Sequence, residues 1–144
     1  MNYLIYVSQA KKPVAEAALA ELLNYSRQRN EEAGITGLLI YRYVPEADRG
    51  NFMQILEGDP ASLSAVWDRI SQDSRHHSIV VLEEAETAGR MFATWTMGFQ
   101  NVSAEDLADY EGYSDLGSDA FWSRIKKQTT AGALGLLQSF YDPS

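Results

Sequence analysis

The sequence contains no cysteine among its 144 residues, so disulfides, zinc–thiolate sites and a thiol nucleophile are excluded. It has no run approaching the ~20 apolar residues of a transmembrane helix, and its start lacks the basic and apolar regions of a signal peptide. We therefore expect a cytoplasmic protein without membrane contact. Basic residues are few, 12 against 20 acidic ones, which gives a net charge of −8. Because nonspecific nucleic-acid binding needs clustered Lys and Arg, we expect no nucleic acid partner.

Common catalytic and cofactor motifs are missing as well. There is no GxGxxG, no P-loop and no Gly-x-Ser-x-Gly elbow. His76 and His77 are adjacent, and adjacent residues on a helix point about 100° apart. They cannot readily share a metal ion, so the sequence predicts no metal site and no hydrolase.

What the sequence does contain is a glutamine between large apolar residues. In a strand, alternate residues share a face, so Phe52, Gln54 and Leu56 point the same way. A buried Gln54 amide needs partners for two donors and an acceptor. Tyr6 stands in a similar position within the apolar residues 3–8. A polar ligand between the two strands would satisfy both side chains.

The apolar pattern predicts alternating strands and helices. We expect strands at residues 3–8, 35–43, 52–57, 79–83 and 92–99, and a hairpin loop at residues 45–51. One helix is expected at residues 11–30, and a second begins at Asp59 and is closed by residues 73–77. This order is close to a ferredoxin-like α+β fold, a βαββαβ(β) sheet with two helices on one face. In that topology the first and third strands are central neighbours. Tyr6 and Gln54 would then lie side by side and face the two helices.

The last part of the chain differs in composition. About 45 residues are too few for a typical second domain, so we expect one main unit at residues 1–100 and a helical extension at residues 101–144. One helix is expected over residues 118–141, although Gly132 and Gly135 weaken it by about 1 kcal/mol each relative to alanine. The extension must dock on the first unit or contact a partner.

Five segments together resemble the BLUF domains, which are blue-light sensors using FAD. They are residues 4–8, Asn30 with residues 34–39, residues 52–58, residues 73–76, and Arg90 and Phe92 with residues 95–97. Their order and spacing match the family over about residues 1–100. The resemblance implies a ferredoxin-like sheet with a noncovalent flavin between two helices, and residues 1–100 as its binding domain. It implies FAD, with FMN as the alternative.

The resemblance also implies a photoactive pair, Tyr6 and Gln54. In the family, light drives electron and proton transfer from the tyrosine to the flavin, and the glutamine then rearranges its hydrogen bonds. A phenol can donate an electron when its proton has an acceptor, and an amide can exchange donor for acceptor at one location. Taken singly, either residue is more often an ordinary core tyrosine or a satisfied amide.

Other site residues follow from the same resemblance. Asn30 would pair with the polar edge of the ring, and Leu22 and Ser26 share its helix face at i, i+4 and i+8. Further cofactor contacts are implied for Arg29, Leu39, Phe52, Asp73, Arg75, His76 and Met97, and a signal relay for Ser8, Trp95 and Met97. A helix C-terminal role is the alternative for Asn30, a solvated helix end for Arg75 and His76, and core packing for Trp95. Whether Trp95 or Met97 faces the flavin stays open.

Two classes of function remain. We expect a photoreceptor without enzymatic activity, which forms a homo-oligomer and signals to a downstream protein partner through the C-terminal extension or the sheet. The alternative is a small ferredoxin-like enzyme or ligand-binding module, such as an acylphosphatase-like protein. Such a protein would need an arginine in a phosphate-cradling loop, and residues 9–13 contain neither arginine nor glycine.

Overall fold

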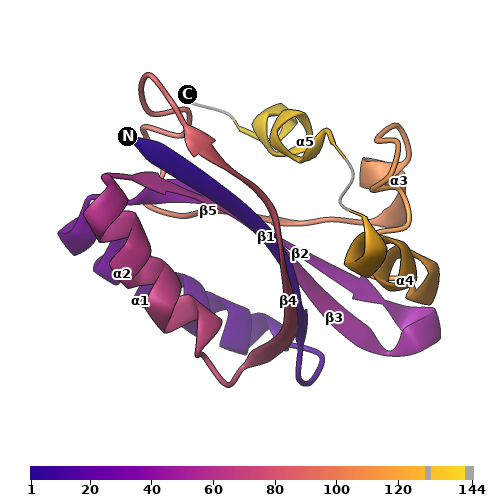
Figure 1. Cartoon of the computed structure of the whole chain (residues 1–144). Helices are drawn as coiled ribbons and strands as arrows, with labels where there is room; N and C mark the ends of the chain where they lie inside the picture. The colour runs from indigo at the N-terminus through magenta and orange to yellow at the C-terminus, as the bar shows by residue number, and fades with distance from the viewer. Residues whose placement is uncertain (129–130, 142–144) are drawn as a thin grey trace.

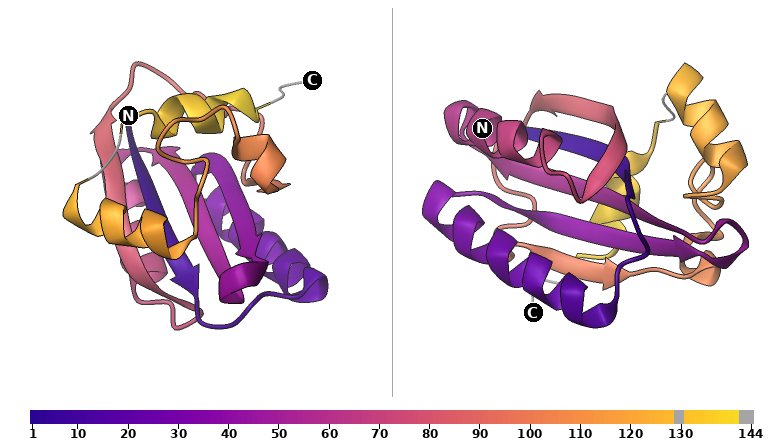
Figure 2. Two further views of the ribbon diagram at one scale, coloured as in Figure 1. Left: turned by 90° about the vertical axis from the view of Figure 1, so that its right-hand side faces the viewer. Right: turned by 90° about the horizontal axis from the view of Figure 1, so that it is seen from below.

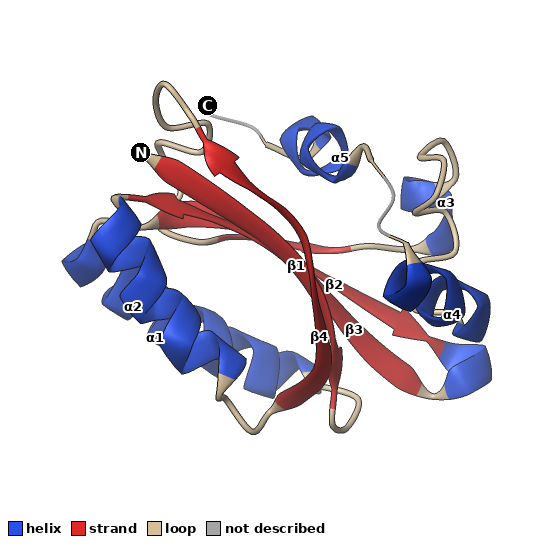
Figure 3. Cartoon of the chain, in the orientation of Figure 1, coloured by secondary structure: helices blue, strands red, loops and turns tan. Residues whose placement is uncertain are grey.

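A five-stranded sheet with helices on both faces forms the protein (Figure 1; Figure 3). The computed structural model describes residues 1–128 and 131–141. The elements are β1 (Asn2–Ala10), α1 (Glu16–Ala33), β2 (Thr36–Val44), the 3-10 turn η1 (Pro45–Ala47), β3 (Arg49–Gly58), α2 (Pro60–Ser71), β4 (His76–Glu86), β5 (Gly98–Asn101), α3 (Ala104–Leu107), α4 (Asp119–Lys127) and α5 (Ala133–Ser139). No helix within the described residues is long and apolar enough to cross a bilayer.

The sheet has the strand order β4-β1-β3-β2-β5. β1 lies antiparallel between β3 and β4, and Tyr6 pairs directly with Gln54. The four longer strands with α1 and α2 form the predicted ferredoxin-like arrangement, and β5 is added parallel to β2 at one edge. The prediction that Tyr6 and Gln54 are neighbours on central strands is confirmed.

Each face of the sheet has its own apolar core. α1 and α2 cover one face, where Leu19, Leu23, Leu63 and Val66 pack against the sheet beside Tyr6. The C-terminal helices cover the opposite face, as Figure 2 shows from two further directions, and contribute Phe121, Trp122, Ile125, Leu136 and Leu137 to a second core. Because each fully buried apolar side chain contributes about 1.5–3 kcal/mol, the extension is a substantial part of the fold.

The helix ends agree with local sequence signals. α2 begins at Pro60 after Asp59, as predicted, since proline suits the first helical position. α1 ends at Gly34, whose φ of 70° lies in the left-handed region that glycine adopts without strain. The Gly34 N–H then bonds to the carbonyl oxygens of the last turn. This turn directs the chain into β2, which lies between β3 and β5 in the sheet.

Two predicted boundaries in the first part of the chain are wrong. The helix predicted over residues 11–30 begins only at Glu16, because Ala15 has extended backbone angles. The loop predicted at residues 45–51 begins as expected but is shorter, since β3 begins at Arg49, which pairs with Val44. Cross-strand packing therefore lengthens the hairpin and leaves η1 as its tip.

Further along the chain, residues 73–77 do not close the second helix. α2 ends at Ser71, and His76 and His77 begin β4, where backbone pairing with β1 holds them. Only the end of the strand predicted at residues 92–99 is extended, because residues 87–97 are irregular up to the start of β5.

The single helix predicted over residues 118–141 is also wrong. α4 begins after Ser118, whose hydroxyl accepts from the Phe121 N–H, and it ends at Lys127. α5 begins after Gly132, which has a φ of 102°. Two shorter helices thus replace the continuous helix that Gly132 and Gly135 would weaken. Residues 129–130 lie outside the described residues.

Candidate functional site

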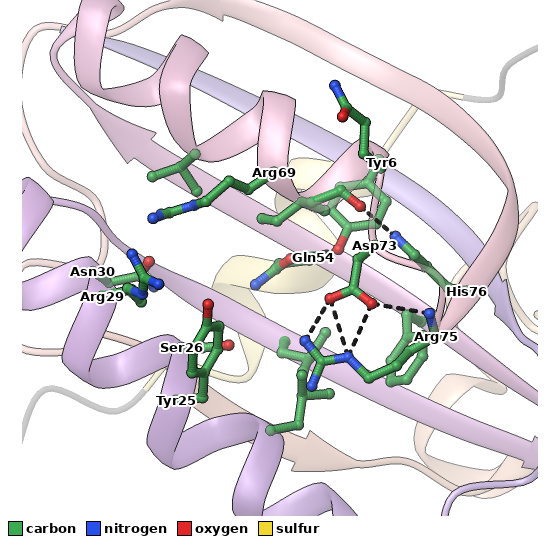
Figure 4. Close-up of a pocket in the computed structure, with 16 residues that line it drawn as sticks. Tyr6, Tyr25, Ser26, Arg29, Asn30, Gln54, Arg69, Asp73, Arg75 and His76 are labelled. Carbon is green, nitrogen blue, oxygen red and sulfur yellow. Dashed lines mark hydrogen bonds and ion pairs between the residues drawn. The ribbon is translucent and has the colours of Figure 1, made fainter.

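A cleft of about 390 Å³ opens between α1, α2 and the sheet face that carries Tyr6 and Gln54 (Figure 4). Its lining consists of Tyr6, Leu22, Tyr25, Ser26, Arg29, Asn30, Leu39, Phe52, Gln54, Val66, Arg69, Ile70, Gln72, Asp73, Arg75 and His76. The volume falls within the range of small-ligand and cofactor pockets. The floor of the cleft follows from the register of β1 and β3, which places Tyr6 beside Gln54.

The floor of the cleft is a buried hydrogen-bonded chain. The Tyr6 hydroxyl donates to Gln54 Oε1 over 2.5 Å, and Gln54 Nε2 donates to the sulfur of Met97 over 3.2 Å. All three side chains are buried. A thioether is a weak acceptor, so the amide is held firmly at its oxygen and weakly at its nitrogen.

Tyr6 lies in an environment that keeps its phenol neutral. Burial raises the pKa of Tyr6 well above its ordinary value, and the negative charge of Asp73 raises it further. The Trp67 ring lies 5.2 Å away and the His76 ring 6.0 Å away, measured between centroids. Loss of an electron would make this phenol strongly acidic, and Gln54 Oε1 already accepts its proton in a hydrogen bond.

One wall of the cleft is the helix face predicted from the sequence. Leu22, Ser26 and Asn30 all line the cleft from α1. Asn30 is only 3% exposed, and its Nδ2 donates to the Thr96 carbonyl over 2.8 Å. Asn30 lies near the C-terminal end of α1, as its alternative reading had it, and it also connects the cleft wall to the segment that carries Met97.

Charged groups gather at the mouth of the cleft. Arg75 Nε donates to Asp73 Oδ1 over 2.9 Å, and its terminal nitrogen also pairs with the carboxylate. Hydrogen bonds from Arg75 lower the pKa of the Asp73 carboxyl below its ordinary value. The guanidinium groups of Arg29 and Arg75 lie over the exposed Tyr25 ring at 5.1 and 5.9 Å. With Arg69, they give the mouth a local positive character in an acidic protein.

His76 connects three elements at one end of the cleft. Its Nε2 lies 2.6 Å from the Ile70 carbonyl oxygen, and its Nδ1 lies 2.7 Å from the Ser8 hydroxyl. Because a carbonyl only accepts, Nε2 carries the proton, and the Nδ1 of a neutral ring accepts from Ser8. β1, the end of α2 and β4 are thereby tied together beside Tyr6, and the predicted relay residue Ser8 contacts a cleft residue.

Trp95 and Met97 lie on opposite faces of the sheet. Met97 is buried against Gln54 in the core under α1 and α2. Trp95 packs in the opposite core, where its ring lies 4.8 Å from that of Tyr141. The structure thus places Met97, rather than Trp95, toward the cleft, although Met97 is not among the lining residues.

Five lining residues were absent from the sequence-based site, namely Tyr25, Val66, Arg69, Ile70 and Gln72. Val66 and Ile70 occur at the i, i+4 spacing of apolar residues that face a core. This pattern does not show whether such a residue packs in the core or lines the cleft. Arg69 lies in the last turn of α2, where the sequence does not separate a cleft residue from a solvated helix end. Within the described residues, no group of three His, Asp or Glu side chains could hold a metal ion.

Fold and site together define an α+β ligand-binding domain, in which a buried phenol–amide pair forms the floor of a cofactor-sized cleft. The sequence model of one family, described as Sensors of blue-light using FAD, matches residues 1–98. This match covers more than half of the chain, which therefore belongs to the BLUF family of blue-light sensors.

Relatives and solved structures agree with this assignment. The chain is 31% identical over 117 residues to the photoactivated adenylate cyclase subunit beta of Euglena longa, covering 81% of this chain and 13% of that protein. It is 30% identical over 126 residues to the subunit alpha of Euglena gracilis, covering 88% of this chain and 12% of that protein. The chain thus spans only a small part of these curated relatives.

Among solved structures, the chain resembles the dark state of the BLUF protein BlrB, with a TM-score of 0.67 and 25% identity over 88% of this chain and 92% of that one. It also resembles Klebsiella pneumoniae BlrP1 with FMN and cyclic diGMP, with a TM-score of 0.61 and 29% identity over 69% of this chain and 25% of that one. The architecture is therefore that of known BLUF proteins.

The cleft also fits a flavin chemically. A flavin ring system is flat and largely apolar, with carbonyl and N–H groups along one edge. Leu22, Leu39 and Ile70 supply apolar walls, and Asn30 and Gln54 supply amides that both donate and accept. The cleft thus combines the apolar surface and the few polar groups that such a ring requires.

Proposed function

We propose that the chain detects blue light with FAD held noncovalently in the cleft, with Tyr6 as electron and proton donor and Gln54 as the switch. The observation that carries this proposal is the buried chain from the Tyr6 hydroxyl through the Gln54 amide to the sulfur of Met97. The flavin, when bound, supplies the blue-light absorption and the excited-state oxidant. The other steps belong to side chains of this protein.

Tyr6 would give an electron and a proton to the bound flavin, the proton leaving along the hydrogen bond to Gln54 Oε1, and both would return to Tyr6 so that the flavin is oxidised again. Gln54 then exchanges the positions of its donor and acceptor groups, because the amide nitrogen and oxygen have nearly the same size. The Met97 sulfur opposes this change only weakly. The altered hydrogen bonds are the stored record of light, and Leu22, Ser26, Asn30 and Leu39 keep the ring in place.

The mouth of the cleft favours a phosphorylated flavin. Arg29, Arg69 and Arg75 bring guanidinium groups that suit phosphate oxygens. We propose FAD over FMN because the family is defined by FAD. Heat release of the bound flavin followed by chromatography identifies it, and FMN as the only species would overturn this choice.

The output is proposed to be a protein contact without catalysis by this chain. Residues 1–100 would bind the flavin, and residues 101–144 would relay the signal to a partner protein or within a homo-oligomer. Tyr141 supports this role, since its hydroxyl lies 2.9 Å from Thr94 Oγ1 and its ring packs on Trp95. The extension therefore touches the segment that also carries Met97.

The direct test is reconstitution with FAD followed by absorption spectroscopy before and after blue light. We expect an oxidised-flavin spectrum that shifts slightly to the red and recovers in the dark. A flavoprotein without a reversible shift would contradict the assigned switch. Absence of any bound flavin would favour the small ferredoxin-like enzyme or binding module.

A further inference from the structure

A buried carboxylate that the photochemistry does not use lies at the end of β3. Glu57 is 0% exposed, and its strand partners are Tyr3 on β1 and Thr36 on β2. It stands three residues after Gln54, and the alternation along a strand directs its side chain to the opposite face of the sheet. A buried charge is costly unless hydrogen bonds compensate it, which implies a specific task.

Three donors converge on the Glu57 carboxylate. The Thr36 hydroxyl donates over 2.7 Å and the Phe92 N–H over 2.7 Å to Oε1, and the Met91 N–H donates over 2.8 Å to Oε2. Among the described residues, no cationic side chain lies within ion-pair distance of Glu57. Arg90 acts through an intermediate, since it donates to Thr36 Oγ1 over 2.9 Å.

These bonds fix the start of the irregular segment that leads to Met97. Phe92 is itself fully buried, and its carbonyl accepts the Trp95 N–H over 3.0 Å in a tight turn. The Trp95 carbonyl in turn accepts the Gly37 N–H of β2 over 3.0 Å. Met91 and Phe92 are therefore the fixed entry to a short turn that directs Trp95 to one face of the sheet.

The exit of the segment is held from the other face. Asn30 donates to the Thr96 carbonyl, and Arg27 Nε donates to the Met97 carbonyl over 2.9 Å. α1 thus holds the Met97 end while Glu57 holds the entry. Only a few residues separate the two anchors, so a shift at the entry moves Met97 relative to the Gln54 amide.

We propose that Glu57 is a positioning residue for the light switch, which sets the place of the Met97 sulfur at Gln54 Nε2 by holding the Met91 and Phe92 amides. β3 then carries both the switching amide and the anchor of the segment that contacts it. This role rests on the proposed photochemistry for its consequence, but the anchoring itself can be measured without light.

The test is Glu57→Gln, which keeps the side-chain volume. The amide oxygen retains the bonds at Oε1, but the amide nitrogen faces the Met91 N–H as a second donor. We expect hydrogen exchange of the Met91 amide to accelerate about tenfold or more, as for the loss of a charge-assisted bond. Flavin binding should persist, and the dark recovery rate should change at least about threefold, because the acceptor at Gln54 Nε2 is misplaced.

Two controls separate positioning from general destabilisation. Glu84→Gln changes an exposed glutamate of β4 and should leave exchange and recovery unchanged. Asn51→Ala removes a buried side chain at the other end of β3 and lowers stability without touching the segment. If Asn51→Ala alters the recovery rate as much as Glu57→Gln does, the role of Glu57 is merely structural and the proposal fails.

The remaining outcomes are also decisive. Should Glu57→Gln not fold, Thr36→Val removes one donor to the same carboxylate, and its recovery rate should shift in the same direction. In the parent protein, Met91 and Phe92 amides that exchange as fast as that of the exposed Gly89 would overturn the proposal. A parent protein without a light-induced shift would instead contradict the proposed function, and the exchange data would still judge the anchor.

Discussion

At the scale of single residues, the cleft floor is a chain of unequal hydrogen bonds. Tyr6 and Gln54 form a short bond between good partners, whereas the bond from Gln54 to Met97 ends on a weak acceptor. The amide is therefore held at one end and easily released at the other. This inequality suits a group that must exchange its donor and acceptor once the phenol changes state.

Tyr6→Phe should keep the flavin and lose the red shift, because the ring still fills its place while the proton and the bond to Gln54 are gone. Loss of that bond should cost about 1 kcal/mol of stability. Absorption spectra before and after illumination measure the first effect, and urea denaturation the second. Tyr43→Phe is the matched control, since Tyr43 donates only to Asp48 at the hairpin tip. A normal red shift in Tyr6→Phe would remove Tyr6 from the mechanism.

The Asp73–Arg75 pair makes a pH-dependent contribution to stability. The folded-state pKa of Asp73 is lowered, so the contribution is complete above the ordinary value of 3.8 and is lost as the pH falls below it. Both side chains are partly exposed, which screens the pair and limits it to about 0.5 kcal/mol.

Asp73→Asn should therefore lower the free energy of unfolding at neutral pH, and the difference from the parent should shrink toward zero in acid. Urea denaturation over this pH range measures it. Asp115→Asn is the comparison, because Asp115 forms a similar partly exposed pair with Arg124 in the extension and its pKa is lowered as well, so the same decrease of the difference in acid is expected. A difference for Asp73→Asn that grows in acid would contradict the assigned direction of the pKa shift.

At the scale of elements, the long hairpin of β2 and β3 links the sheet to the C-terminal extension. Asn51, fully buried near the hairpin tip, accepts from Trp122 Nε1 of α4 over 2.9 Å and donates to the Arg42 carbonyl over 3.1 Å. Gly117 approaches so closely that a Cβ there would lie 2.2 Å from the Asn51 amide nitrogen. The extra hairpin length thus forms the docking site for α4.

Asn51→Ala should destabilise the protein by about 1–3 kcal/mol, because it leaves the indole N–H and a backbone carbonyl without their partner in the core. Denaturation in urea followed by tryptophan fluorescence gives the change. Asn24→Ala, on the exposed side of α1, is the matched substitution and should have almost no effect. Equal effects of the two variants would show that the contact with Trp122 contributes nothing.

The central strands were predictable because their pattern is local, whereas the course of the irregular residues 87–97 was not. Short continuous apolar runs around Tyr6 and Gln54 indicate strands buried on both faces from a few neighbouring residues alone. Residues 87–97 have no such run, and their course depends on Glu57, Gly37 and Asn30, which are distant in sequence. The start of α1 was placed too early for a similar reason, since Pro13 is equally compatible with a loop before a helix.

At the scale of the whole molecule, one sheet separates two cores with different tasks. The core under α1 and α2 holds the cleft, and the core under the C-terminal helices includes Trp95, Phe92 and Tyr141. The split of residues 118–141 into two helices could not be read from the sequence, because it depends on how Trp122 and Leu137 fit the sheet. Since strands are shared between the cores, the chain should unfold as one cooperative unit.

Leu137→Ala should lower the stability of the entire chain by about 2–5 kcal/mol, as expected for a fully buried leucine. Flavin absorbance reports on the cleft side, and in a Trp67→Phe background tryptophan fluorescence comes from Trp95 and Trp122 of the opposite core. Both signals should shift to the same new midpoint in urea. Ser123→Ala, on the exposed side of α4, should move neither probe. Separate midpoints would show that the extension unfolds independently of the flavin-binding part.

The most direct measurement is the light-minus-dark absorption difference of the FAD-loaded parent beside Gln54→Leu, which removes the amide and keeps a side chain of similar size. A reversible red shift in the parent that is absent from a flavin-binding Gln54→Leu protein is the predicted result. An equal red shift in both proteins would show that the Gln54 amide is not the switch.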